Sequence, residues 1–297
     1  MAASLCDEVA PYFFNGRVRK TETQIATRAA VHGKFAFRCV GAFMETHTQA
    51  ALLMDLHSHL SSCEIIGLLG GRWDADAKTI TVVRAYPCQR VEGSHSMTSV
   101  ELDPAAEVAT RTLMEAQGLV PVGWYHSHPI FEPIPSAKDA ENQRNYQALF
   151  SSEASGAAPF LGAIVGPYDR MLPSEESALK WFVVRQRNGE LVPFNVVSEF
   201  EAPLATLDSE DEAALKDVVT LLKDDIGRID LTEMWRPFRK LEGGLPSGGP
   251  CTKLAKLRAA LSRYLATETV EEELAAEALL DRVSKHVQSV WALDLGY

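Results

Sequence analysis

Apolar positions in the first two thirds of the chain follow helical and strand-like periods in turn. From residue 46 to 62 they recur every three or four positions, which predicts a helix with a buried face. Short apolar runs rich in β-branched residues and bounded by Gly or Pro predict strands. We expect strands at 64–71, 79–86, 97–104, 119–129, 159–168 and 178–186.

Two more helices are predicted between these strands. One opens at Pro104 and ends at Gly118, with Pro in its first turn and Gly after its last, the usual asymmetry of helix ends. The other covers Ser136 to Phe150. Because strands and helices are interspersed, we expect an α/β or α+β domain over residues 43–198.

Beyond Glu199 the strand signals vanish and amphipathic helices replace them, which predicts a helical C-terminal region at 199–297. We expect its helices to pack as a bundle that covers the sheet. Residues 1–42 are polar and mixed, and are expected to form an arm or a short helix. By composition, 243–250 is a flexible linker and 236–240 a solvated basic run. The apolar helix faces are predicted at Leu254, Leu257, Leu261, Tyr264 and Leu265, and at Val270, Leu274, Val283, Val287 and Trp291.

Composition and charge narrow the function classes. The 297 residues are 46% hydrophobic and 23% charged, enough apolar surface for a sizeable core, so disorder is excluded as the main state. The 40 acidic residues outnumber the 29 basic ones, giving a net charge of −11. Unaided nucleic-acid binding is therefore not expected, since it depends on Lys and Arg neutralising phosphates. The acidity favours a basic protein partner for the segment 199–297, which holds 19 of the acidic and 12 of the basic residues.

Cysteine usage and hydropathy bear on the compartment. The five cysteines are widely spaced and form no C-x-x-C pair, which indicates free thiols in a reducing, intracellular compartment. Apolar runs fall well short of the ~20 residues that span a bilayer, so we expect no membrane association. The first fourteen residues lack a basic start followed by an apolar core, so a secretory signal is not expected.

One histidine pair suggests a metal site. On a strand, positions two apart point to the same side, so His126 and His128 can aim both imidazoles at one point. Asp139 follows a loop stiffened by three prolines and falls in the first turn of the next helix, where the chain can fold back on the strand end. Two His and one carboxylate, with a fourth position for water, are the ligand pattern of a catalytic zinc site. The sequence therefore predicts one bound Zn²⁺.

Each half of this pattern also has a structural interpretation. An isolated H-x-H is common without a metal, and Ser136 with Asp139 three residues later fits a capping box at a helix start. A second H-x-H, His57 and His59, lies in a helical stretch, where positions two apart point to nearly opposite sides. We expect surface or packing histidines at those two positions.

Zinc-assisted hydrolysis needs further groups. Glu64 stands at the head of a very apolar strand, where an ionisable group is costly to bury unless it has a task or a partner. It is the candidate proton acceptor, and the alternative is an exposed residue at the strand's start. Ser136 is the candidate hydrogen-bond donor to an oxyanion, and plain N-capping is its alternative.

The five positions together carry a resemblance. Glu64 followed by H-x-H-x7-S-x2-D, through His126, His128, Ser136 and Asp139, is similar to the signature of the JAMM (MPN+) metalloproteases. Residues 44–184 resemble in particular the histone deubiquitinases that carry Myb and SWIRM domains, and the MPN-domain-containing proteins. The resemblance implies an MPN fold, a mixed and curved sheet flanked by helices. It implies one zinc on His126, His128 and Asp139, with Glu64 as general base and then general acid and Ser136 as oxyanion donor.

The activity that the resemblance implies is isopeptidase cleavage. Ubiquitin, or a ubiquitin-like modifier, would be removed from lysine of a protein, with histone H2A and ubiquitin chains as candidate substrates. Loops at 88–97 and 167–177 are expected to contact ubiquitin. No Myb or SWIRM segment precedes the MPN segment, so chromatin targeting of that kind is not expected. The location implied is the nucleus, the cytoplasm or both.

Two other functions stay open at this stage. A non-catalytic MPN scaffold within a complex is one, and the intact ligand set argues against it. A chromatin or modified-DNA reader is the other, and the acidic balance argues against direct DNA binding. The C-terminal helices also have an alternative to covering the sheet: they are a candidate docking surface for a second MPN protein or an identical chain.

Overall fold

A computed structural model describes residues 36–37, 42–91, 96, 98–151, 158–196, 199–201, 207–235, 251–265, 267 and 269–293. The predicted arm before residue 36, the basic run 236–240 and the linker 243–250 lie outside the described residues. The strands are β1 (Ala36–Phe37), β2 (Ala42–His47), β3 (Ile66–Asp74), β4 (Thr79–Cys88), β5 (Val120–Ser127), β6 (Leu161–Gly166), β7 (Ala178–Arg187), β8 (Glu190–Val196) and β9 (Glu199–Glu201). The helices are α2 (Thr48–His59), α3 (Pro104–Ala116), α4 (Ala137–Leu149), α5 (Ser209–Leu221), α6 (Lys253–Ser262) and α7 (Val270–Trp291).

The strands form one mixed sheet in the order β1-β2-β4-β3-β5-β6-β7-β8, and β9 also pairs with β2. The pairs β2–β4, β2–β9 and β5–β6 are parallel, and the other pairs are antiparallel. Strand β5, which carries the H-x-H motif, lies between β3 and β6 in the interior of the sheet. A mixed α/β architecture of the MPN kind is therefore confirmed.

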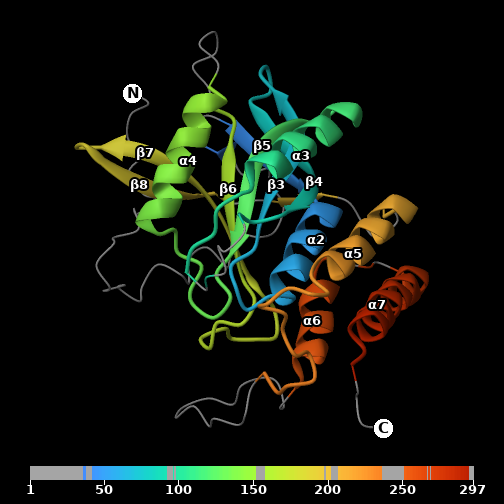
Figure 1. The fold of residues 1–297 in the computed structure, drawn as a ribbon. Coiled ribbons are helices and arrows are strands. Elements are labelled where there is room, and N and C mark those ends of the chain that lie inside the picture. The colour runs from blue at the N-terminus through green and yellow to red at the C-terminus, as the bar shows by residue number, and fades with distance from the viewer. Residues whose placement is uncertain are drawn as a thin grey trace.

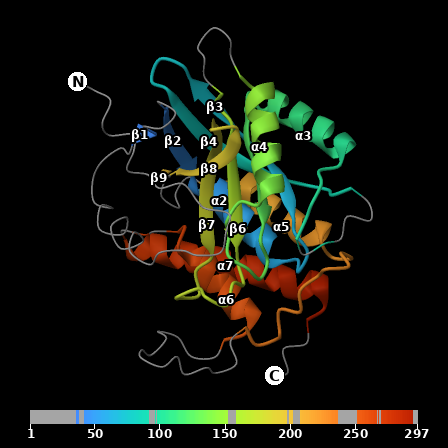
Figure 2. The same ribbon diagram turned by 90° about the vertical axis from the view of Figure 1, so that its left-hand side faces the viewer.

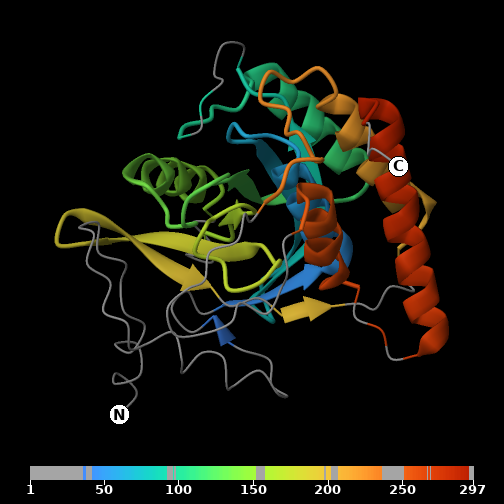
Figure 3. The same cartoon turned by 90° about the horizontal axis from the view of Figure 1, so that it is seen from below.

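Helices cover both faces of this sheet (Figures 1 and 2). Helices α3 and α4 lie on one face, and α2, α5, α6 and α7 gather on the other, with α7 outermost when the molecule is viewed from below (Figure 3). Apart from Gln49, every residue of α2 is buried, because this helix is enclosed between the sheet and the C-terminal helices. One hydrophobic core consequently runs from the sheet through α2 into α5, α6 and α7.

The apolar faces predicted for the C-terminal helices are only partly buried. All five apolar positions predicted between 254 and 265 are buried, as are Val283, Val287 and Trp291. Val270 and Leu274 are 72% and 67% exposed, so the prediction that they share the packed face is wrong. Helix α7 packs against α5 and α6 through its later turns, whereas these two residues lie in its first two turns.

One predicted strand is wrong, and four observed strands were not predicted. Residues 97–104 do not form a strand: where described, they hold one isolated bridge, between Leu102 and Arg90, and then the start of α3. The segment has no free sheet edge to pair with, because β4 and β3 already have neighbouring strands on both sides. The sequence interpretation also missed β1, β2, β8 and β9, and β9 lies in the part expected to be helical.

In the described part of the chain, the cysteines form no disulfide bonds. Cys63, Cys88 and Cys251 are free thiols. Within the same described ranges, none of the helices combines the length and the apolar character that a bilayer crossing needs.

Candidate metal centre

The alternation of β5 sends its side chains to two different environments. Trp124 and His126 face the α3–α4 side, where their rings stack with centroids 4.7 Å apart. Tyr125 faces α2, and its hydroxyl lies 2.9 Å from Nδ1 of His57. Ser127, on the same side as Tyr125, accepts a hydrogen bond from the backbone N–H of Ile65 at 3.1 Å. The strand thus presents the motif histidines to α4 while its other face is fixed to α2 and to the start of β3.

Helix α4 brings the carboxylate to the histidines. Ser136 is its N-cap, and Ser136 Oγ accepts a hydrogen bond from the Asp139 N–H at 3.2 Å. Asp139 Oδ2 in turn accepts from the Ser136 N–H at 2.7 Å, completing a capping box. This reciprocal pair fixes the Asp139 side chain at the first turn of the helix. The capping box and the ligand position are therefore the same structure, so the two interpretations of this motif are compatible.

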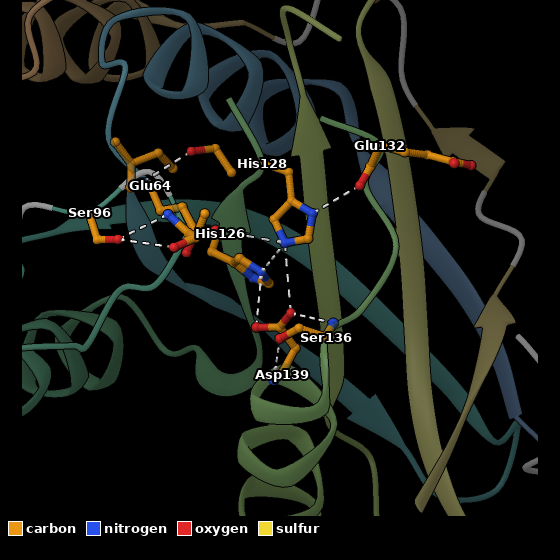
Figure 4. A network of polar contacts seen from close by, with 10 residues as sticks. Glu64, Ser96, His126, His128, Glu132, Ser136 and Asp139 are labelled. Carbon is orange, nitrogen blue, oxygen red and sulfur yellow. Dashed lines mark hydrogen bonds and ion pairs between the residues drawn. The ribbon is translucent and has the colours of Figure 1, made fainter. Parts of the chain in front are cut away.

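Three predicted ligands converge on one point (Figure 4). Nε2 of His126 lies 3.2 Å from Nε2 of His128 and 3.2 Å from Oδ1 of Asp139. Nε2 of His128 lies 3.7 Å from Oδ2 of Asp139. All three residues are buried, and their candidate ligand atoms lie within 4.8 Å of one another.

The charge states of Asp139 and His128 suit a cation, whereas the charge of Asp139 raises the pKa of His126 against the effect of burial. The imidazoles of His126 and His128 hold the pKa of Asp139 well below its usual range, although burial opposes this. Burial lowers the pKa of His128, and the neighbouring His126 lowers it further. The Nδ1–H of His128 donates to the carbonyl of Glu132 at 3.1 Å, which leaves its Nε2 lone pair facing the cluster. Two nitrogen donors and a carboxylate with one open side fit Zn²⁺.

Glu64 lies beside this cluster, in the segment between α2 and β3. It is 4% exposed, so the alternative interpretation of an exposed residue at the strand's start is wrong. Its Oε1 lies 3.9 Å from Nε2 of His128. Burial and the charge of Asp139 raise the pKa of Glu64 to about 7, against the opposing charge of His126. A carboxyl group with such a pKa exchanges protons near neutral pH.

Ser136 is exposed at the edge of the cluster. Its Oγ uses a lone pair to accept from the Asp139 N–H, so its hydroxyl proton remains available for a second partner. N-capping and donation to a substrate oxygen are therefore compatible at this residue.

The second H-x-H does not join the site. His57 and His59 are 1% and 0% exposed within α2, and are packing residues as expected. Nδ1 of His59 lies 2.9 Å from the backbone carbonyl of Asp55, one turn earlier in the helix. Lys256 of α6 lies 3.4 Å from Nε2 of His59. This pair ties α2 to α6.

Two groups that support the site were missed by sequence reasoning. The carbonyl that orients His128 belongs to the backbone of Glu132, and a backbone group leaves no residue-type signal. Arg90 donates to the backbone carbonyl of Glu64 at 2.8 Å and lies 26 residues away from it in the chain. Its position between two expected strands gave no periodic pattern that could have identified it.

The geometry agrees with comparisons to known proteins. Residues 25–152 match the family described as JAB1/Mov34/MPN/PAD-1 ubiquitin protease. The human deubiquitinase MYSM1 is 39% identical over 139 residues, which are 47% of this chain and 16% of that protein. The Xenopus laevis histone H2A deubiquitinase MYSM1 is 33% identical over 153 residues, which are 52% of this chain and 18% of that protein.

A third relative extends further along the chain. The zebrafish (Danio rerio) MPN domain-containing protein is 31% identical over 212 residues, 68% of this chain and 45% of that protein. These alignments span less than half of each relative's length, and less than a fifth of the two deubiquitinases. The resemblance drawn from the five-residue signature is thus confirmed for the MPN segment.

Proposed function

We propose that this chain, whose residues 25–152 belong to the JAB1/Mov34/MPN/PAD-1 ubiquitin protease family, is a zinc-dependent isopeptidase that releases ubiquitin from lysine side chains. The observation that carries the proposal is the convergence of His126, His128 and Asp139 beside a buried carboxyl group, that of Glu64. The proposed catalytic unit is residues 43–198, with 199–297 covering it.

Each residue of the site has a distinct task in this proposal. His126, His128 and Asp139 would hold the zinc, which when bound supplies a Lewis acid that lowers the pKa of water towards ~7. Glu64 accepts the proton of the attacking water and then delivers it to the departing lysine amine. Burial favours the neutral form of this carboxyl, which suits a group that must take up a proton and then give it back.

Ser136 serves the other side of the scissile carbonyl. Its hydroxyl proton donates to the carbonyl oxygen as negative charge develops there. The capping box holds Ser136 against Asp139, so the donor and the ligand keep a fixed separation. The burial of His126, His128 and Glu64 keeps bulk water away from the reacting groups.

The substrate proposal follows the named relatives. Two of them are called deubiquitinases, and the Xenopus laevis protein is called a histone H2A deubiquitinase. We therefore propose mono-ubiquitylated histone as the first substrate to test, and with it the nucleus as the location of the chain. A second MPN protein or a second copy bound through the C-terminal helices is proposed as partner, and light scattering at several concentrations tests the second copy.

The experiment uses zinc-loaded full chain against a panel of di-ubiquitins and mono-ubiquitylated nucleosomes, with Glu64→Gln as the matched variant. Cleavage by wild type and its loss in Glu64→Gln, with zinc still at one per chain, is the expected result. Equal cleavage by both proteins would refute the role of Glu64. Zinc near zero per chain, together with no cleavage, would instead favour a non-catalytic scaffold.

A further inference from the structure

The segment that carries Glu64 is held by the C-terminal region. Residues 60–65 connect α2 to β3 without regular secondary structure. The Ser62 N–H donates to the carbonyl of Gly227 at 2.7 Å, and the Ile229 N–H donates to the carbonyl of Leu60 at 3.1 Å. The Ser62 hydroxyl also donates to the Gly227 carbonyl, at 2.9 Å. A loop after α5 therefore pairs with the chain just before Glu64.

Arg90 and Asp225 extend this contact to Glu64 itself. Nη1 of Arg90 donates to the backbone carbonyl of Glu64 at 2.8 Å, and Nη2 of Arg90 forms an ion pair with Oδ2 of Asp225. The other carboxylate oxygen, Oδ1, accepts from the Gly227 N–H at 2.7 Å and from the Ser61 hydroxyl at 3.2 Å. The side chains of Arg90 and Asp225 are only 7% and 10% exposed. The planar guanidinium thus bridges two fixed acceptors.

The position of the Glu64 carboxylate depends on this backbone anchorage. Oε1 of the Glu64 side chain lies 3.9 Å from Nε2 of His128, too far for a hydrogen bond. The Glu64 backbone is held at both ends: its N–H donates to the Ser96 carbonyl at 2.9 Å (Figure 4). Its carbonyl accepts from Arg90. Loss of Asp225 would leave Arg90 nearly buried without its counter-charge, which is costly. Arg90 would then be free to leave the Glu64 carbonyl.

Close packing at Gly227 makes the contact specific. A methyl group at Gly227 would lie 2.8 Å from Sγ of Cys63 and 2.8 Å from Oγ of Ser61. Real side-chain carbons do not approach so closely, so the loop and the Glu64 segment fit without spare room. The methyl group would also lie 3.0 Å from Oδ1 of Asp225, so Gly227→Ala perturbs the contact while both charged residues stay in the chain.

We propose that Arg90 and Asp225 are positioning residues for Glu64, so that Asp225 of the C-terminal region supports the catalytic unit formed by residues 43–198. This inference rests on the proposed isopeptidase function. It places a required element in the C-terminal region, outside the segment 25–152 matched to the family. The zinc ligands lie on β5, directly after it and on α4, so zinc binding does not depend on the ion pair.

The test compares full-length Asp225→Asn, Arg90→Met and Arg90→Lys with wild type. Asp224→Asn is the matched control, because Asp224 is the exposed neighbouring acid. For cleavage of di-ubiquitin, Asp225→Asn and Arg90→Met should lower kcat roughly 10- to 100-fold with KM within about 3-fold, since small misplacements of catalytic groups cost that much. Arg90→Lys should recover part of the loss. Zinc should stay at one per chain, and the double variant should be no slower than the worse single variant.

A second readout does not need turnover. Hydrogen exchange by mass spectrometry should show faster exchange over residues 60–66 in Asp225→Asn and in Gly227→Ala, but not in Asp224→Asn. Wild-type kcat in a folded Asp225→Asn protein, or a loss matched by lost zinc, would overturn the proposal. If zinc-loaded wild type cleaves nothing, the isopeptidase function fails, and unchanged exchange over 60–66 would separately refute the contact with 222–229.

Discussion

The buried imidazole of His57 should make the free energy of unfolding depend on pH. This histidine is buried in α2, with Nδ1 2.9 Å from the hydroxyl of Tyr125. Burial and, to a smaller extent, the charge of Arg90 lower its pKa from 6.5 to about 3, against the opposing charge of Asp225. The imidazole is therefore neutral in the folded chain at every pH above about 3, whereas it becomes protonated in the unfolded chain below about 6.5.

The sign of the effect follows from this difference in bound protons. Between pH 6.5 and 3 the unfolded state holds the extra proton, so the free energy of unfolding falls as the pH falls. While only the unfolded state is protonated, the slope from His57 approaches about 1.4 kcal/mol per pH unit. Over the whole window the loss is on the order of 4–5 kcal/mol, a large part of the ~5–15 kcal/mol typical of a folded protein.

Urea unfolding between pH 7.5 and 4.5 measures this slope. His57→Gln removes the titrating group but keeps hydrogen-bonding capacity towards Tyr125, so its stability should decline less steeply, by up to about 1.4 kcal/mol per pH unit. At pH 7.5 the variant should be less stable by about 1–2 kcal/mol from altered packing. His47→Gln, at the half-buried N-cap of the same helix, controls for loss of a histidine. Parallel pH profiles for wild type and His57→Gln would refute the reasoning.

Three further predictions concern the site and its strands. Ser136→Ala should lower the free energy of unfolding by about 1 kcal/mol, because the helix cap is lost, and urea unfolding measures this. It should also lower kcat for di-ubiquitin cleavage by about 10²-fold, because the hydrogen-bond donor is lost. Ser136→Thr should recover the cap. Gly67→Ala should destabilise the fold by more than about 2 kcal/mol, because the added carbon would lie 2.3 Å from the Tyr125 ring, and unchanged urea unfolding would contradict this. Zinc at 100 times its Kd should add about 2.7 kcal/mol to the free energy of unfolding of wild type. Asp139→Asn should lose most of that gain. Thermal unfolding of both proteins, with and without a chelator, measures the difference.

The convergence of His126, His128 and Asp139 was predictable because it depends on local geometry. The two-residue spacing of His126 and His128 needs only a strand, and that strand is β5. The position of Asp139 needs only a capped helix start, and Ser136 provides it. Two separate local patterns therefore indicated the same cluster before any tertiary structure was known.

The contacts that support the cluster were not predictable, because they join distant parts of the chain. Arg90 and Asp225 are 135 residues apart, and neither lies in a periodic pattern. The prediction of a strand at 97–104 was wrong for a related reason. An alternating sequence shows which face of a strand would be apolar, but not whether a sheet edge is free to pair with that strand. Val270 and Leu274 likewise fit an apolar helix face that the fold leaves exposed.

The pairing of the loop 222–229 with the Glu64 segment has a consequence for synthesis of the protein. Ser61 and Asp225 are separated by 164 residues, so the ribosome must add the whole of that stretch before the two can meet. At ~5–20 residues per second this takes about 8–30 s, and the candidate ligands His126, His128 and Asp139 are synthesised within that interval. In a nascent chain the contact that holds the Glu64 backbone can therefore form only after the loop 222–229 has left the ribosomal tunnel.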